Sequence, residues 1–205
     1  MNCRFAGMNY LGHAYLSFDS PEILIGNMIS DFVKGSAKFS FNGTIQKGIM
    51  LHRMIDEFTD AHAATKKAKE VIRPHYRLYS GAIMDVLYDH FIANDILVFN
   101  DVSLKQFSFS TYTQLELHYS QLPDRFKHLL FYMRTENWLY NYRTREGIRK
   151  SLHGLARRAV YIKETDTAFE LFLSNYDRLE ECYHSFFKDV KLFAKQKFEA
   201  LLSED

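Results

Sequence analysis

The chain has few of the residues that mark secreted or membrane-spanning proteins. Its 205 residues include two cysteines, three prolines and nine glycines. Two cysteines cannot form the disulfide framework of a small secreted domain, which favours a reducing compartment. The N-terminus has no long apolar run behind a basic start, as a signal peptide would, and no segment reaches the roughly 20 apolar residues of a membrane span. We therefore expect a cytoplasmic protein that does not enter a membrane.

The chain also lacks an excess of charge of either sign. It carries 26 Lys and Arg side chains against 25 Asp and Glu, for a formal net charge of +1 at pH 7. This balance provides no overall attraction to nucleic acid or to an anionic membrane. We therefore expect no nucleic-acid partner, and any partner attracted by charge must bind to a local patch.

What the sequence does contain is apolar residues at helical spacing. Hydrophobic residues make up 47% of the chain, enough to fill a sizeable core at this length. In the segment 51–62, LHRMIDEFTDAH, the apolar residues recur three and four positions apart on one helical face. We find no linker, internal repeat or glycine-rich phosphate loop. The sequence predicts a single all-α domain, a helical bundle, over residues 1–205.

Capping and turn residues predict where several of these helices begin and end. One helix should begin after Asp19 or Ser20 and stop at Gly35, since serine and aspartate favour helix starts and glycine favours helix ends. Asp60 should cap a helix that begins near Ala61.

Two later segments give less direct signals. Apolar residues in the segment 103–119 alternate as in a strand, but Ser103 and Gln106 resemble a capping box, which favours a helix. From Phe169 to Phe193 the apolar positions are three and four residues apart. This spacing predicts one long amphipathic helix or two helices in series.

Acidic residues and histidines recur four residues apart on three predicted helices. The pairs are Asn27 with Asp31, His52 with Asp56, and Asp85 with Asp89, which is followed by His90. Residues four apart share a helix face, and most such charged pairs are simply solvated. Apolar residues flank Asp31 and Asp85 on both sides, however, and a buried carboxylate is costly unless it is paired or binds a metal. The spacing leaves both a solvated face and a metal site open.

If a metal is bound, the ligand types limit its identity. Helical bundles build metal sites from inward-facing acids and histidines on facing helices. Mixed histidine and carboxylate ligands suit manganese, iron or zinc better than calcium.

Several segments together resemble one known family. MNYLGHAYLSF, GNMISDFVKG, GIMLHRMIDEFTDAH and DVLYDHF resemble, in order and spacing, the signature segments of the acyl carrier protein phosphodiesterase family. Three later segments of the chain resemble the C-terminal half of that family: ENWLYNYRTREGI, LARRA and YDRLEECYHSFF. The resemblance runs from Met8 onward, and family members commonly begin at the matching methionine. Residues 1–7 are therefore expected to be an N-terminal extension or a misassigned start.

The resemblance implies a bacterial cytoplasmic hydrolase with a divergent HD-type helical fold. Such enzymes use a divalent metal, typically Mn²⁺, with Fe²⁺ or Mg²⁺ as alternatives. They remove the 4′-phosphopantetheine arm from holo-acyl carrier protein, leaving the apo-carrier protein and free 4′-phosphopantetheine. The matching positions in this chain are His13, Asp31, His52, Asp56, Asp85, Asp89 and His90. Two departures from the family pattern are Gly12, where alanine is usual, and Met54, where a second arginine is usual.

This chemistry suggests metal-binding roles for five of the matching residues. Asp31, His52 and Asp85 would bind the ion, which would offset the charge of the phosphate and activate a water molecule. Asp56 or Asp89 would complete the coordination or orient a ligand histidine.

The same chemistry requires a general acid, because the carrier serine leaves as an alkoxide unless it is protonated. His90 is the first candidate and His13 the second. His13 also lies on a short apolar stretch, where a structural core histidine is nearly as good an interpretation.

A basic segment offers a place for an acidic, helical carrier protein to dock. Between Tyr140 and Lys163 the chain has seven Lys and Arg residues and a single acid, Glu146. On a helix, Arg149 and Arg157 would share a face, although many basic faces are merely solvated. Arg53, beside His52, is a further candidate for substrate contact. Nearby tyrosines and Trp138 are better explained as core residues than as a nucleic-acid stacking surface.

Three functions stay open on the sequence. The first is the metal-dependent carrier-protein phosphodiesterase. The second is an HD-type phosphohydrolase acting on a nucleotide or another small phosphoester. The third is a non-catalytic helical module that binds an acidic protein. Metal content separates the third from the others, and dependence on the carrier protein separates the first from the second.

Overall fold

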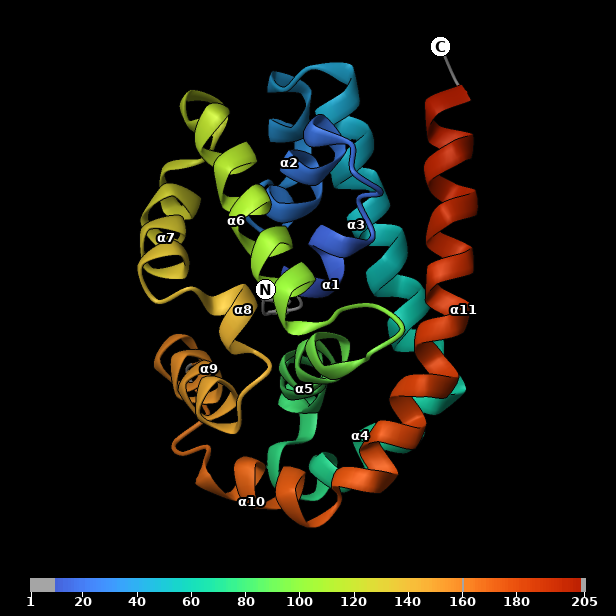
Figure 1. Cartoon of the computed structure of the whole chain (residues 1–205), viewed down its shortest axis with the longest axis vertical. Coiled ribbons are helices and arrows are strands. Elements are labelled where there is room, and N and C mark those ends of the chain that lie inside the picture. The colour runs from blue at the N-terminus through green and yellow to red at the C-terminus, as the bar shows by residue number, and fades with distance from the viewer. Residues whose placement is uncertain (1–9, 160, 204–205) are drawn as a thin grey trace.

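The computed structural model describes residues 10–159 and 161–203, and no strand occurs among them. This confirms the all-α prediction. Four short 3₁₀ segments are η1 (Ser30–Phe32), η2 (Gly35–Ser40), η3 (Arg77–Tyr79) and η4 (Tyr119–Gln121). The α-helices in Figure 1 are α1 (Tyr10–Tyr15), α2 (Pro21–Ile29), α3 (Gly43–Ala61), α4 (Ala63–Tyr76), α5 (Ser80–Asn94), α6 (Asp101–Leu117), α7 (Asp124–Thr135), α8 (Trp138–Asn141), α9 (Arg145–Arg158), α10 (Asp166–Ser174) and α11 (Tyr176–Ser203).

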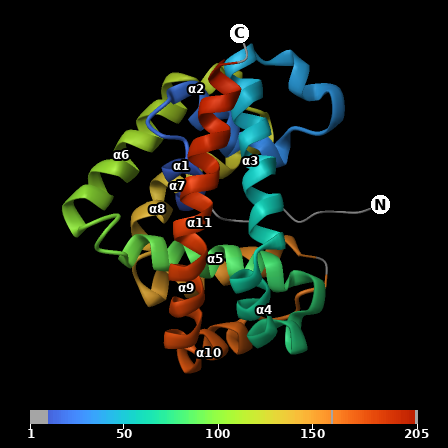
Figure 2. The same cartoon turned by 90° about the vertical axis from the view of Figure 1, so that its right-hand side faces the viewer.

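The helices surround α5, which is the most deeply buried long helix. Twelve of its fifteen residues are buried, as expected for a helix that is apolar on nearly every side. The 28-residue α11 packs along α3 and α4 on one side of the molecule, and α6 and α7 lie on the other (Figure 1). Figure 2 shows α5 running across α3 and α11. Apolar side chains from these helices form one connected core.

Two glycines allow a close contact between α2 and α3. A Cβ atom added to Gly26 on α2 would overlap the carbonyl oxygen of Ile45 on α3. A Cβ atom on Gly48 of α3 would lie 2.5 Å from the carbonyl oxygen of Ile23. Glycine has no Cβ atom, so the two backbones can touch where any other residue would push them apart. The crossing holds α3 directly against α2.

The two segments with less direct signals, 103–119 and 169–193, are both mainly helical. Residues 101–117 form α6, whose N-cap, Asn100, lies three residues before the expected Ser103. Its capping box is formed by Asn100 and Ser103, each accepting a 2.9 Å hydrogen bond from the other's backbone amide, so the expected Ser103–Gln106 box is wrong. The apolar stripe after Phe169 belongs to two helices in series, α10 and α11.

Two other expected helix ends are also wrong. The helix after Ser20 ends at Ile29, and Gly35, with φ of +57°, begins η2 instead of ending α2. Asp60 does not cap α4. The cap is His62, whose Nδ1 accepts a hydrogen bond from the amide of Ala64 at 3.2 Å. The Asp60 carboxylate instead binds the Lys69 ammonium at 2.6 Å.

None of the described helices has the length and apolar character needed to cross a membrane. Three further expectations stay predictions. The first, that residues 1–7 are an extension or a misassigned start, lies outside the described residues. The cytoplasmic location and the HD-type relationship are not tested by this arrangement.

The glycine crossing gives a first testable prediction. Gly26→Ala should destabilise the protein by roughly 1–3 kcal/mol, because the methyl group meets backbone that cannot rotate away. Gly154→Ala is the matched control: Gly154 lies inside α9 with nothing within 4 Å of its would-be Cβ atom. That control should gain about 0.5–1 kcal/mol. Urea unfolding measures both, and equal effects would show that the crossing is not tight.

Candidate metal centre

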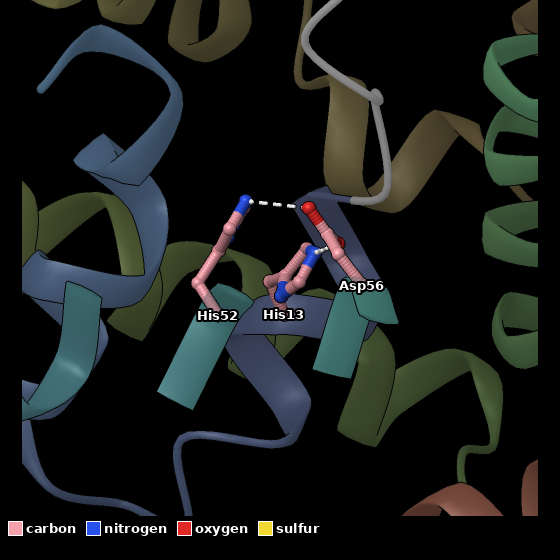
Figure 3. Close-up of side chains that lie close together, drawn as sticks. All are labelled: His13, His52 and Asp56. Atoms are coloured by element: carbon pink, nitrogen blue, oxygen red, sulfur yellow. Dashed lines mark hydrogen bonds and ion pairs between the residues drawn. The ribbon is translucent and has the colours of Figure 1, made fainter. Parts of the chain in front are cut away.

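Three predicted residues meet where α1 packs against α3. His13 comes from α1, and His52 and Asp56 come from α3, one turn apart (Figure 3). The Asp56 carboxylate bridges the Nε2 edges of the two rings: its Oδ1 is 3.1 Å from His13 Nε2 and its Oδ2 is 3.2 Å from His52 Nε2. The rings stack with their centroids 3.9 Å apart. Both histidines are buried, whereas the Asp56 side chain is 47% exposed, so the cluster opens towards solvent through its carboxylate.

Contacts from two other helices hold His13 in place. On α5, the Asp89 carboxylate accepts hydrogen bonds from the amides of Leu11 (3.2 Å) and Gly12 (2.9 Å) at the start of α1. On α2, the Asn27 side chain donates to the carbonyl of His13 at 2.9 Å. These bonds satisfy backbone groups that a short, buried helix would otherwise leave unpaired.

The cluster perturbs the pKa of each member in a different way. Burial alone would lower the pKa of His52, but the negative charges of Asp56 and Asp31 outweigh it and raise that pKa to about 10. Burial and the neighbouring His52 lower the pKa of His13. Burial would raise the pKa of Asp56, but the two histidines hold it well below its usual range. The site therefore attracts one positive charge and disfavours a second proton.

The donor atoms fit a divalent metal ion. One ligand atom from each of His13, His52 and Asp56 lies within 4.8 Å of the others. Two imidazole nitrogens and a carboxylate oxygen are a common set for first-row divalent metals, and three ligands leave positions for water or substrate. The Nδ1 atoms of both histidines have no hydrogen-bond partner among the described residues. No contact at Nδ1 therefore forces the ring proton onto Nε2, where it would block binding of the ion.

Comparisons with known proteins show the family of the chain. The model of the family "Acyl carrier protein phosphodiesterase" matches residues 8–190, which include all three cluster residues. The chain belongs to the acyl carrier protein phosphodiesterase family. This confirms the resemblance stated above.

Curated relatives match the chain over nearly its whole length. The acyl carrier protein phosphodiesterase of Yersinia pestis is 32% identical over 192 residues, which cover 93% of this chain and 99% of the relative. Those of Klebsiella pneumoniae (strain ATCC 700721 / MGH 78578) and Enterobacter sp. (strain 638) are 31% and 30% identical over 191 residues, with the same coverage. No solved structure matches this chain.

Two more of the expected metal ligands lie near the cluster. Asp31, in η1, has a carboxylate oxygen 3.5 Å from His52 Nε2. Burial and the charge of Asp56 raise the pKa of Asp85, on α5, well above its usual range, while Lys69 opposes this shift. Asp85 is thus in electrostatic reach of the cluster, although it does not form part of the three-residue group.

Asp89 and His90 are not brought to the cluster. Both oxygens of Asp89 accept from the amides of α1, as described above. His90 Nδ1 lies 2.8 Å from the carbonyl of Tyr142, and its Nε2 lies 3.1 Å from the hydroxyl of Tyr176. Burial lowers the pKa of His90 to about 4, which keeps it neutral. Its two partners lie directly after α8 and at the start of α11.

The three expected substrate-binding arginines have different surroundings. Arg53 is exposed, and its guanidinium donates to the carbonyl of Val33 at 2.9 Å, which holds it beside η1. Arg149, on α9, lies over the ring of Phe169, 4.7 Å from its centroid. Arg157, in the last turn of α9, is exposed.

Lys69 near the cluster was missed by the sequence reasoning. Its side chain is buried on α4 and binds Asp60, and it also acts on the charge of Asp85. The available signal was its position beside Ala68 and Ile72 on the apolar face of α4. A lysine on an apolar face requires a partner, and Asp60 provides one.

The perturbed pKa values predict how stability depends on pH in metal-free protein. The folded pKa of His52, about 10, exceeds the ordinary value of 6.5, so its contribution is complete below pH 6.5 and lost as pH rises through 10. The folded pKa of Asp56 lies below the ordinary 3.8, so its contribution is present above 3.8 and lost as pH falls further. The free energy of unfolding of wild type should exceed that of Asp56→Asn by most between pH 3.8 and pH 6.5, the two ordinary pKa values.

Urea unfolding in the presence of a chelator, at about pH 5 and about pH 9, measures this difference. It should be clearly larger at the lower pH. A difference that does not change between the two would show that the His52–Asp56 pair is not charged in the folded protein.

Proposed function

We propose that this chain is a metal-dependent phosphodiesterase acting on holo-acyl carrier protein. It would hydrolyse the phosphodiester that joins 4′-phosphopantetheine to a serine of the carrier, releasing apo-carrier protein and 4′-phosphopantetheine. Family membership supports the substrate, since the curated relatives bear that activity in their names. The observation that carries the mechanism is the convergence of His13, His52 and Asp56 on one another.

The proposed ligands are His13, His52 and Asp56, with Asp31 and Asp85 as nearby carboxylates. Mn²⁺ is the proposed ion and Fe²⁺ the first alternative, because Mg²⁺ prefers oxygen ligands to imidazole. When bound, the ion supplies Lewis acidity that offsets phosphate charge and lowers the pKa of a water molecule.

The chain's own residues contribute orientation and charge. In the metal-free protein, Asp56 holds both imidazoles by their Nε2 atoms, so the three groups that would bind the ion already face one another. Asp31 lies against the same Nε2 atom of His52, at 3.5 Å. Arg53, anchored to the carbonyl of Val33, offers a cation at the exposed rim for the phosphate or the carrier.

Of the two histidines proposed for catalysis, the contacts favour His13 at the reacting centre. His13 shares Asp56 with His52, whereas both ring nitrogens of His90 contact tyrosines away from the cluster. A metal-bound imidazole with a lowered pKa has no proton to give to the leaving oxygen, so the role proposed for His13 is that of a ligand and not of the general acid. His90 is better explained as a structural residue.

Mass spectrometry of the carrier protein tests the proposed function. Incubation of holo-acyl carrier protein with the enzyme and Mn²⁺ should convert it to the apo mass, and a chelator should prevent this. His52→Ala and Asp56→Asn should each slow conversion at least ~100-fold, because ligand loss removes metal and orientation together. A near-normal rate of conversion by either variant at saturating Mn²⁺ would contradict the assignment of His52 and Asp56 as metal ligands.

Asp189→Asn is the matched control for these variants. Asp189 forms a comparable ion pair with His62 at 3.2 Å, on α11, and its side chain is 56% exposed. Losing that pair should leave conversion unchanged.

His13 and His90 are separated by a further pair of variants. His13→Gln should lose activity while keeping most of its stability. His90→Gln should lose about 1–3 kcal/mol of stability, because buried tyrosine partners are left unpaired, yet keep wild-type kcat and Mn²⁺ affinity below its unfolding temperature. A loss of kcat in folded His90→Gln would return His90 to the reacting centre.

A further inference from the structure

A short exposed segment, which we call the η2 loop (residues 34–40), stands out from the bundle close to the metal centre. None of the six residues of η2 is buried. Figure 2 shows the segment in blue at the upper right, projecting beyond the start of α3. Gly35 turns the chain there with φ of +57°, and a Cβ atom added to it would have nothing within 4 Å. The loop therefore presents its side chains to solvent instead of the core.

Short contacts connect this loop to the metal centre. Asp31, whose carboxylate lies 3.5 Å from His52 Nε2, precedes Lys34 by three residues. The Cα atoms of Asp31 and Lys34 are therefore at most about 11 Å apart. From α3, the Arg53 guanidinium donates to the carbonyl of Val33, the residue before the loop, at 2.9 Å. The loop and the centre are thus neighbours in the structure.

Arg53 also lies beside the opening of the centre. The cluster opens to solvent through Asp56, the one ligand candidate of the three that is not buried. Arg53 precedes Asp56 by three residues on α3, and side chains three apart are neighbours on a helix surface. Arg53 is itself exposed. The η2 loop and Arg53 together border the opening on one side.

This border is basic. Between Asp31 and Asp56 the sequence contains no acid, and it contains four Lys and Arg residues, which are Lys34, Lys38, Lys47 and Arg53. Lys34, Lys38 and Arg53 form no ion pair with any residue that the structure describes. Their charges are therefore available to a partner.

Two acids lie close to the border and reduce its charge without cancelling it. Glu22 accepts a hydrogen bond from the side chain of Asn42 at 2.7 Å, just after the loop, and the exposed Glu57 follows Arg53 by one turn. With both acids charged, the four Lys and Arg residues still outnumber them. The acids of the centre itself would be offset by its ion. The border therefore fits an acidic partner.

The η2 loop also offers an apolar contact. Phe39 is 67% exposed, and the Lys38 ammonium lies 5.0 Å from the centroid of its ring. A single exposed aromatic residue is ordinary on a protein surface. An aromatic ring set among cations nevertheless matches a partner whose apolar surface is surrounded by acids, because aromatic residues are enriched at the centres of interfaces.

The position of the bond to be cleaved decides what must lie on this border. That bond is at a serine of the carrier protein, so the surface of the carrier around the serine has to reach the opening of the centre. A stable interface buries about 800 Å² on each partner, a patch roughly 15 Å in radius. A patch of that size at the opening includes Arg53 and extends to the η2 loop.

Charge sets the direction in which the carrier extends from the opening. Towards the C-terminal end of α3 the exposed side chains after Asp56 include Glu57 and Asp60, which repel an acidic protein. Towards the η2 loop the exposed charges are positive. An acidic carrier seated on the opening is therefore drawn over the loop.

We propose that the η2 loop and Arg53 are the docking surface for the acidic carrier protein. Lys34, Lys38 and Arg53 face its acids, and Phe39 contacts its apolar surface. The identity of the partner rests on the proposed function.

Binding of apo-acyl carrier protein tests docking separately from hydrolysis, because the apo form has no phosphodiester. The test variant is Lys34→Glu/Lys38→Glu, which leaves the metal centre and Arg53 unchanged. Its Kd for apo-carrier protein at about 0.1 M salt should rise at least ~10-fold, because like charges meet across the interface. Wild-type affinity should weaken with added salt, and more steeply than that of the variant.

Lys105→Glu/Arg125→Glu is the matched control, since it changes the net charge by the same amount. Both residues are exposed, and they belong to α6 and α7, on the other side of the molecule from α3 and α11 (Figure 1). Charges farther away than a Debye length are screened, so this control should bind apo-carrier protein within about twofold of wild type.

Hydrolysis separates docking from chemistry. For the Lys34→Glu/Lys38→Glu variant, KM for holo-carrier protein should rise while kcat stays unchanged, because only uniform binding is lost. Hydrolysis of a small activated phosphodiester, which needs no docking, should proceed at the wild-type rate.

Phe39→Ala tests the apolar contact. It removes a ring without changing charge, so Kd for apo-carrier protein should rise at least ~5-fold at low and at high salt alike. Phe109→Ala is its matched control: Phe109 is 71% exposed, close to the value for Phe39, but lies on α6. Its loss should leave Kd unchanged.

Three results would overturn the docking proposal. The first is an unchanged Kd for apo-carrier protein, or an unchanged KM for holo-carrier protein, in the Lys34→Glu/Lys38→Glu variant. The second is equal weakening in both charge-reversal variants, which would reflect net charge instead of a local surface. The third is an equal loss on the carrier and on the small phosphodiester, which would mean that the loop supports the centre. If wild type binds the apo-carrier protein but never removes the arm from the holo form, the proposed hydrolysis fails while docking stands.

Discussion

The contact between Gly26 and Gly48 is the constraint on which the centre depends. Because these residues have no Cβ atoms, the backbones of α2 and α3 touch. The neighbour of Gly26, Asn27, then reaches the carbonyl of His13, and one turn after Gly48 the chain presents His52. A single crossing thus sets the two imidazoles face to face. Asp89 completes the arrangement from α5 by holding the first amides of α1, so a buried acid serves the site without touching its ligands.

The electrostatics of this region require a cation. Asp31 and Asp56 flank His52, and their charges raise its pKa despite burial. In the absence of metal, a proton on His52 meets that requirement. A divalent ion would replace the proton, because a metal binds the neutral imidazole. Lys69, bound to Asp60 and acting on Asp85, supplies positive charge from α4. The same acids therefore stabilise the metal-free protein and prepare it for the ion.

Some of this centre could be predicted from the sequence, and the reason is local geometry. The spacing of His52 and Asp56 places them on one face of any helix, and apolar neighbours indicate that Asp31 faces inward. The family segments added His13. Spacing does not reveal the partner of a side chain, so the hydrogen bonds of Asp89 with distant α1 could not be foreseen. His90 follows Asp89 directly, and about 100° of helical rotation turns it to Tyr142 and Tyr176. The cap expected at Asp60 was wrong for a related reason: its carboxylate pairs with Lys69, a contact that local propensity does not reveal.

Crystals grown with Mn²⁺ and measured at the manganese absorption edge test the central claim most directly. The account predicts one anomalous peak with His13 and His52 nitrogens and an Asp56 oxygen about 2 to 2.5 Å away. The same peak should be absent from crystals of His52→Ala. A fully occupied ion held elsewhere, with these three side chains outside its coordination sphere, would contradict the account.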